Sequence, residues 1–237
     1  MIGRIGIAAC ALLGATACEV RTVNEDTEAN QAAQPEQPES DPYASNPQAI
    51  ARARQLAAAQ APEEQRARLR EQARGELRDL RFVVDISDRE LRVLSGDREV
   101  ETHPVAVGSE EWPTPTGSWE FHRVDFNPEW NPPKTEDWAK DETRKAPGDP
   151  ENPMGRARLV YRMPNTVHGT DDLDSLGKAV SHGSIRVANE VALNLAEMLL
   201  KAGHAWEGPQ WFGQMTQDRT TEYQIELPDG IPIEVQE

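Results

Sequence analysis

Cysteine is nearly absent from this chain of 237 residues, and the positions of the two cysteines matter more than their number. They are Cys10 and Cys18, so every later residue lacks a thiol. This excludes an internal disulfide and a catalytic thiol from the rest of the chain. Covalent catalysis there would have to use an oxygen nucleophile.

Aromatic side chains and long apolar runs are also scarce. Aromatic residues make up 5% of the chain and hydrophobic residues 37%, so we expect part of it to lie outside a packed core. Near the N-terminus, Arg4 precedes an apolar run from Ile5 to Leu13. The run is too short to span a bilayer as a helix and is typical of an export signal.

The residues before Cys18 extend this prediction to a lipid anchor. Ala15, Thr16 and Ala17 are small and resemble a bacterial lipobox, in which the cysteine is lipidated and becomes the new N-terminus, although leucine is usual where Ala15 stands. We therefore predict a signal peptide over residues 1–18 and a protein anchored on the periplasmic side of the cell envelope. The alternative is an ordinary secretory signal that is cut near Ala17, with Cys18 incidental.

Positive charge is scarce over most of the chain. The net charge is −16, and most of it falls on residues 82–237. An acidic catalytic region argues against nucleic acid as a partner, because phosphates require the opposite sign. Residues 19–49 carry seven acids against one arginine and hardly any large apolar side chains, which predicts a disordered tether.

Residues 50–80 differ in composition, because alanine and arginine dominate them. These are good helix formers. Sparse leucines and Pro62 predict two mostly exposed helices, over roughly 48–60 and 62–79. We interpret this segment as a helical spacer; the alternative is that its arginines contact anionic lipid, glycan-linked carboxylates or a partner protein.

From residue 81 to 237 the pattern changes to short β-rich runs separated by turn residues. This spacing favours a β-sandwich or barrel. The predicted strands cover 81–86, 90–94, 99–107, 118–124 and 157–162, and residues 222–235 return to β character around a turn at Pro228-Asp229-Gly230.

One helix is expected within this region, starting with Asn189 as its cap and closing at Gly203. Its predicted core-facing stripe has apolar residues at helical spacing. The stripe consists of Val191, Leu195, Met198, Leu199 and Ala202.

The candidate catalytic residues lie in a set of motifs that follow one another in a fixed order along the chain. His168-Gly169-Thr170 is followed by Ser181-His182-Gly183-Ser184-Ile185-Arg186, and further blocks lie at 104–108, 114–117, 127–133 and 152–155. Together they resemble the L,D-transpeptidase catalytic domain of the YkuD type, over roughly residues 81–227. The resemblance implies a mainly β, sandwich or barrel-like domain with one or two packed helices, acting on peptidoglycan stem peptides.

The resemblance also implies roles for the motif residues. In that family a cysteine attacks the carbonyl between an L-centre of diaminopimelate and D-alanine, and an amine of a neighbouring stem resolves the thioester. Carried over, His168 is the base and Ser184 occupies the position of the nucleophile. The residues implied for the oxyanion hole and substrate binding are His182, Gly183, Arg186, Gly169, Thr170 and Ser181.

Without the resemblance, the residue types by themselves are weaker evidence for these catalytic roles. Acyl transfer needs a nucleophile, a base and donors for the developing oxyanion, and two histidines with glycines and a hydroxyl on a turn-rich segment could supply them. His182 could equally serve as a structural hydrogen-bonding group rather than a base.

A serine at position 184 leaves three interpretations open. A hydroxyl is far less acidic than a thiol and must lose its proton to a base during attack. The protein could be a serine acyltransferase or hydrolase, a pseudoenzyme that binds stem peptides, or a variant in which serine was engineered in place of cysteine.

Two tryptophans form a further candidate element. Trp130 and Trp138, with Pro132-Pro133, could form a lid over a substrate groove, or a surface loop pinned by aromatic packing. No metal-ligand spacing or nucleotide-binding glycine motif is present, so we expect no cofactor.

Overall fold

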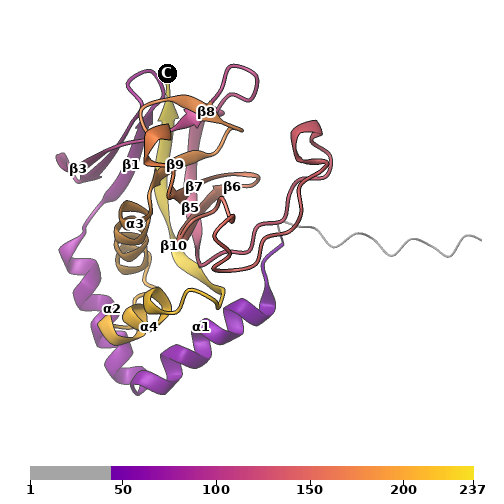
Figure 1. Cartoon of the computed structure of the whole chain (residues 1–237). Helices are drawn as coiled ribbons and strands as arrows, with labels where there is room; N and C mark the ends of the chain where they lie inside the picture. The colour runs from indigo at the N-terminus through magenta and orange to yellow at the C-terminus, as the bar shows by residue number, and fades with distance from the viewer. Residues whose placement is uncertain (1–43) are drawn as a thin grey trace, which may run out of the picture. The chain divides into compact units, whose positions relative to one another are not determined.

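The computed structural model describes residues 44–237. The predicted export signal over 1–18, lipidation at Cys18 and most of the predicted tether over 19–49 lie outside the described residues and stay predictions. The described part is mainly β, with four α-helices (Figure 1). None of its helices is long and apolar enough to cross a membrane.

Two sheets make up the β structure of residues 44–237. The larger has the strand order β3-β2-β1-β10-β5-β6-β7-β9, and a smaller one joins β4 and β8. The strands are β1 (Leu80–Asp85), β2 (Glu90–Ser95), β3 (Arg98–Pro104), β4 (Val107–Gly108), β5 (Gly117–Phe126), β6 (Ala157–Arg162), β7 (Asn165–Thr170), β8 (Ala179–Ser181), β9 (Ile185–Ala188) and β10 (Tyr223–Gln236).

The larger sheet curls until its two ends nearly meet. Ala106, two residues beyond β3, forms an antiparallel bridge to Arg186 in β9, with N···O distances of 2.9 and 2.8 Å. The result is a nearly closed, barrel-like sheet, which confirms the predicted fold class. The bridge also places the segment after β3 beside the strand that follows Ser184.

The predicted turn at Pro228-Asp229-Gly230 is wrong. Strand β10 continues through these residues and pairs with β5 on both sides of a register shift between Glu226 and Ile231. A bulge sets extra residues of one strand against fewer residues of its partner, and pairing resumes beyond it. The turn-forming residues therefore mark a bulge in one long strand.

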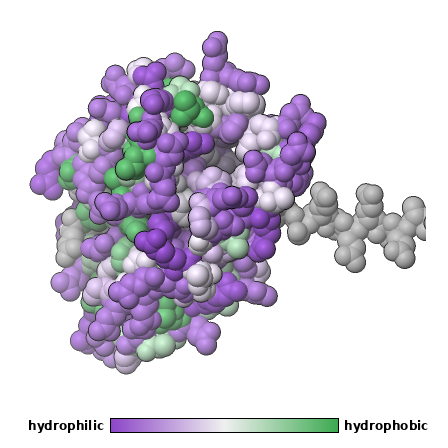
Figure 2. Space-filling view, viewed as in Figure 1, coloured by the Kyte–Doolittle hydropathy of each residue, from purple (hydrophilic) through white to green (hydrophobic). Residues whose placement is uncertain are grey.

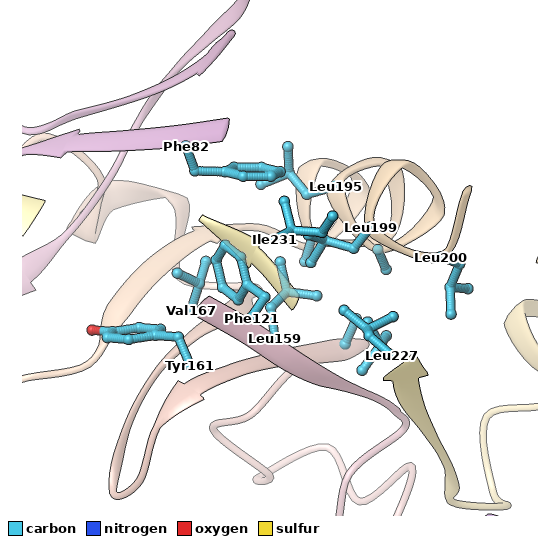
Figure 3. Packing of buried hydrophobic residues seen from close by; sticks show 14 of the residues in the cluster. Phe82, Phe121, Leu159, Tyr161, Val167, Leu195, Leu199, Leu200, Leu227 and Ile231 are labelled. Atoms are coloured by element: carbon cyan, nitrogen blue, oxygen red, sulfur yellow. The ribbon is translucent and has the colours of Figure 1, made fainter. Parts of the chain in front are cut away.

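Helix α3 (Asn189–Ala202) fills the inside of the curled sheet. Leu195 and Leu199 are fully buried and lie among Phe82, Phe121 and Leu159 from three strands (Figure 3). Burying each such side chain contributes roughly 1.5–3 kcal/mol. The predicted stripe faces this core, with Val191 and Met198 only partly buried at its margin.

Asn189 does not cap this helix. The N-cap position is Ala188, which has no side-chain cap hydrogen bond. The Asn189 amide oxygen instead accepts from the Arg156 N–H at 2.7 Å, and its nitrogen donates to Asp171 at 2.7 Å. Asn189 thus joins the helix start to the segments beside β6 and β7.

The two predicted N-terminal helices form, but they are not a free spacer. Helix α1 (Pro47–Gln60) begins before residue 50, because Asn46 caps it by accepting from the N–H groups of Gln48 and Ala49. Ala49, Ala53 and Ala57 recur every four residues and are buried against the domain. Most other residues of α1 are exposed, as expected.

Two further helices complete this packing. Helix α4 (Pro209–Gln217), which the sequence analysis did not predict, lies against α1, and the Trp211 indole donates to Ala53 O at 3.2 Å. Helix α2 (Glu63–Glu76) is fastened to Glu207 by Arg66 and Arg70. The catalytic domain thus has two packed helices, α3 and α4, as expected, and the helices of the predicted N-terminal extension, α1 and α2, pack onto it as well.

Candidate functional site

His168 and Ser184 come together because two strands lie side by side. Strands β7 and β9 pair in parallel, with His168 opposite Arg186, and Ser184 directly precedes β9. The Thr166 N–H donates to Ser184 Oγ at 3.2 Å. Ser184, His168 and Arg186 line one cleft. His168 is thus part of a strand, not of a turn-rich segment as the sequence suggested.

The environment of His168 sets its proton chemistry. The residue is 2% exposed, and its Nδ1 lies 2.9 Å from Gly169 O. A carbonyl only accepts hydrogen bonds, so Nδ1 carries the proton and Nε2 of the neutral ring is free to accept one. Burial above all, then the positive charges of Arg186 and Arg158, lower its pKa to about 4, against the opposing effect of the Gly169 hydrogen bond. His168 is therefore neutral at physiological pH.

The turn before β9 depends on a glycine. Gly183 has φ +94°, and a Cβ atom there would lie 2.6 Å from Asn165 Nδ2. Ser181 Oγ accepts from the Gly183 N–H at 3.2 Å and donates to Ser184 O at 2.5 Å. Because the Gly183 N–H is already bonded, the N–H groups of His182 and Ser184 are the better oxyanion candidates.

His182 occupies a different environment in the same turn. Its ring stacks on Trp138 at 3.8 Å between centroids and 11° between planes, and Trp112 lies on it at 4.5 Å. Partial burial lowers its pKa, followed in size by the effect of Arg186, while Glu111 opposes the change. The ring of His182 is therefore held by aromatic packing, an arrangement that was not among the two roles weighed from the sequence.

The loop between β5 and β6, residues 127–156, forms one wall of the cleft. It extends away from the sheet (Figure 1) and is tied at its base by Asn127, whose amide donates to Asp218 O at 2.6 Å and Thr221 O at 3.1 Å. Trp130 and Trp138 both line the cleft. Trp138 is also pinned by its stacking on His182, so the structure shows features of both alternatives.

The cleft has a volume of about 610 Å³ and carries charges of both signs. Arg158 and Arg186 lie near His168, whereas glutamates lie on the loop wall and on the segment before β5. Much of the molecular surface in view is hydrophilic (Figure 2). Within residues 44–237, no group of three or more His, Cys, Asp or Glu side chains is placed to hold a metal ion.

Gly169 and Thr170 follow His168 along β7 and, like Gly183, are not among the residues that line the cleft. A side chain at Gly169 would overlap the Asn189 amide, and Thr170 Oγ1 accepts from the Asp172 N–H at 3.1 Å. Both shape the strand end that holds the histidine. The cleft residues that the sequence analysis missed include Arg158, whose only sequence signal is a charge between the apolar Ala157 and Leu159.

The family model of the L,D-transpeptidase catalytic domain (YkuD) matches residues 79–205, more than half of the chain. The chain belongs to this family. The match confirms the resemblance on which the sequence analysis relied, and its range includes His168, Ser184 and Arg186.

Individual relatives agree with this assignment. Over 120 residues the chain is 33% identical to a Bacillus licheniformis protein named "Putative L,D-transpeptidase YkuD", covering 50% of this chain and 59% of that protein. It is 28% identical over 172 residues to the Escherichia coli "Probable L,D-transpeptidase YbiS", covering 63% of this chain and 56% of the relative. The chain thus matches less than two thirds of the length of either protein.

A crystal structure of L,D-transpeptidase 3 from Mycobacterium tuberculosis aligns with a TM-score of 0.44 at 19% identity, covering 67% of this chain and 61% of that one.

Proposed function

We propose that this protein is an acyltransferase that modifies peptidoglycan stem peptides at L,D-bonds, with Ser184 as nucleophile and His168 as base. The observation that carries the proposal is the neutral His168, whose Nδ1 is committed to Gly169 O and which lines the same cleft as Ser184. The substrate class is supported by family membership and by relatives named L,D-transpeptidases.

In the first half of the reaction, Ser184 Oγ attacks the carbonyl carbon of the L,D-bond while its proton passes to His168 Nε2. The N–H groups of His182 and Ser184 stabilise the oxyanion. Collapse of the tetrahedral intermediate breaks the C–N bond, and His168 returns the proton to the leaving amine. The product is an ester on Ser184.

In the second half, an amine of a neighbouring stem, or water, attacks the ester carbonyl and gives a proton to His168. Collapse releases Ser184 Oγ, which takes that proton back. The products are a new amide, or a free acid when water attacks. The cycle needs neither a redox partner nor a metal.

A silent wall-binding protein is the second candidate, and specific observations favour it. A base with a pKa of about 4 provides little driving force for removing a proton from a hydroxyl. Moreover, the hydrogen-bond partner of Ser184 Oγ among the described residues is the Thr166 N–H, not His168. In this case the cleft would bind stem peptides without turning them over.

The two candidates are separated by assaying diaminopimelate-containing muropeptides with the natural protein, Ser184→Ala and Ser184→Cys. We expect slow release of D-alanine or crosslinking by the natural protein, none by Ser184→Ala, and at least tenfold faster turnover by Ser184→Cys, because a thiol ionises far more readily. Activity in the Cys form alone would support the silent protein. No activity in any form, without binding to sacculi, would reject both.

We also propose that the protein is exported and anchored through Cys18, as supported by the apolar run and the small residues before that cysteine. Retention in the membrane fraction should then be lost in Cys18→Ala. Unchanged retention would contradict lipid anchoring.

A further inference from the structure

Arg158 is a charged residue beside the reaction centre to which the family motif assigns no role. Strand β6 runs antiparallel to β7, and Arg158 lies directly opposite His168 in the register. Its side chain is 13% exposed and lines the cleft. Its positive charge is one of the smaller causes that lower the pKa of His168.

A buried carboxylate holds Arg158 in place. Asp125 in β5 is completely buried, and its Oδ2 accepts from Arg158 Nε at 2.8 Å and lies 2.7 Å from Nη2. Its other oxygen accepts from Arg123 Nε at 2.8 Å, and Arg123 in turn donates to Ser45 Oγ at 2.7 Å. Both oxygens of Asp125 are thus occupied, so the guanidinium of Arg158 is fixed in orientation.

This arrangement leaves positive charge on the side of the cleft next to His168. The guanidinium groups of Arg123 and Arg158 share the carboxylate of Asp125. The pKa of Glu129 is lowered in part by the charge of Arg158, but Glu129 forms its ion pair with Arg144. An arginine has five N–H donors, and Asp125 engages only one edge of the fork. The remaining donors can form charge-assisted hydrogen bonds to a second carboxylate, which are about twice as strong as neutral ones.

The reaction proposed above predicts where such a carboxylate would lie. His168 must give its proton to the leaving amine, so the leaving D-residue has to lie against His168. The α-carbon alone separates that amine from the α-carboxylate of the same residue. Arg158, the cross-strand neighbour of His168, is therefore beside the expected position of this carboxylate.

We propose that Arg158 binds the α-carboxylate of the leaving D-residue and so selects donor stems that end one residue after the scissile bond. The inference rests on the proposed function, because it takes the position of the leaving group from it. Asp125 is the positioning residue that keeps the guanidinium aimed at the cleft. A donor with a neutral C-terminus would leave the guanidinium of Arg158 without a carboxylate partner. The site should therefore bind such a donor more weakly, because its polar group stays unpaired.

The test compares two donors, a stem tetrapeptide with a free terminal D-alanine and the same peptide with a C-terminal amide. Binding is measured by calorimetry in a Ser184→Ala background, so that turnover is not required. The parent should bind the acid at least tenfold more tightly than the amide. Arg158→Gln should abolish this preference by weakening only the acid, and Arg158→Lys should retain part of it. Arg81→Gln, on the exposed side of β1, is the matched control and should change neither affinity.

The outcomes separate this inference from the proposed function. Equal weakening of both peptides by Arg158→Gln would mark a structural role and overturn the inference alone, as would an acid preference that survives the substitution. Failure of the parent to bind either peptide would overturn the proposed function as well.

Discussion

Two histidines from the same short motif region end in opposite surroundings. His168 lies inside β7, is 2% exposed and has one ring nitrogen bonded to a carbonyl. His182 lies in the turn before β9, is exposed, and is held by stacking on Trp138 and a tilted contact with Trp112. The hydrogen bond to the Gly169 carbonyl fixes the tautomer of His168. The ring of His182 is held by the aromatic side chains that contact it. The first arrangement leaves Nε2 of His168 available to accept a proton, and the second places the ring of His182 on the cleft wall.

The largest expected effect comes from replacing each of the two histidines by glutamine. In His168→Gln we expect kcat for acyl transfer to fall by about 10³, because the proton acceptor is lost while glutamine can still donate to Gly169 O. In His182→Gln we expect a change of less than tenfold, since its ring only packs. The measurement is D-alanine release from muropeptides, using Ser184→Cys as the parent if the natural protein is slow.

Circular dichroism on both variants serves as the folding control. If His182→Gln lost as much activity as His168→Gln while remaining folded, the roles assigned to the two residues would be reversed.

A second test uses the pH dependence of stability. The pKa of His168 falls from 6.5 to about 4 on folding, so between these values the unfolded chain binds a proton that the folded chain does not. Stability from this source is present above pH 6.5 and is lost as the pH falls towards 4. A shift of this size corresponds to about 3 kcal/mol at most.

Urea unfolding of the natural protein and His168→Gln at pH 7.5 and 4.5 measures this contribution, because other groups cancel in the difference. The natural protein should lose about 2–3 kcal/mol more than the variant on acidification. His182→Gln should follow the natural protein much more closely. Parallel losses in all three proteins would show that His168 titrates normally.

The smallest expected effect comes from removing the tryptophan that covers His182. Because burial is the main cause of the lowered pKa of His182, Trp138→Ala should raise that pKa towards 6.5. The titration of His168 should not move. NMR titration of the two imidazole rings follows both residues in one experiment, with Trp206→Phe, distant from His182 in the packing around α4, as the control. An unchanged His182 titration would mean that stacking does not desolvate the ring.

Local pattern predicted the elements whose packing follows sequence periodicity. The β1–β2 hairpin and α3 carry apolar residues at the spacing of a strand and of a helix, and both form where expected. Strand β7 was not predicted, because Asn165, His168 and Gly169 hide the alternation of a strand, and β9 was not predicted because it has only four residues. The docking of α1 was missed because its buried face consists of alanines such as Ala53, which give little apolar signal.

The sequence by itself determined the family and the nucleophile chemistry that is available. The ordered motifs around His168 and Ser184 identify the domain, and the lack of any cysteine after Cys18 excludes a thiol nucleophile there. Both are properties of residue identity and order, so they can be read without coordinates.

Only the tertiary structure decided which histidine is buried and which arginine lies beside it. Parallel pairing of β7 with β9 and antiparallel pairing of β6 with β7 bring His168, Ser184 and Arg158 to one cleft. Such contacts depend on strand register across the sheet. A shift of one residue in the register would turn these side chains to the opposite face of the sheet. Desolvation and charge, which lower the pKa of His168, exist only once that register is formed.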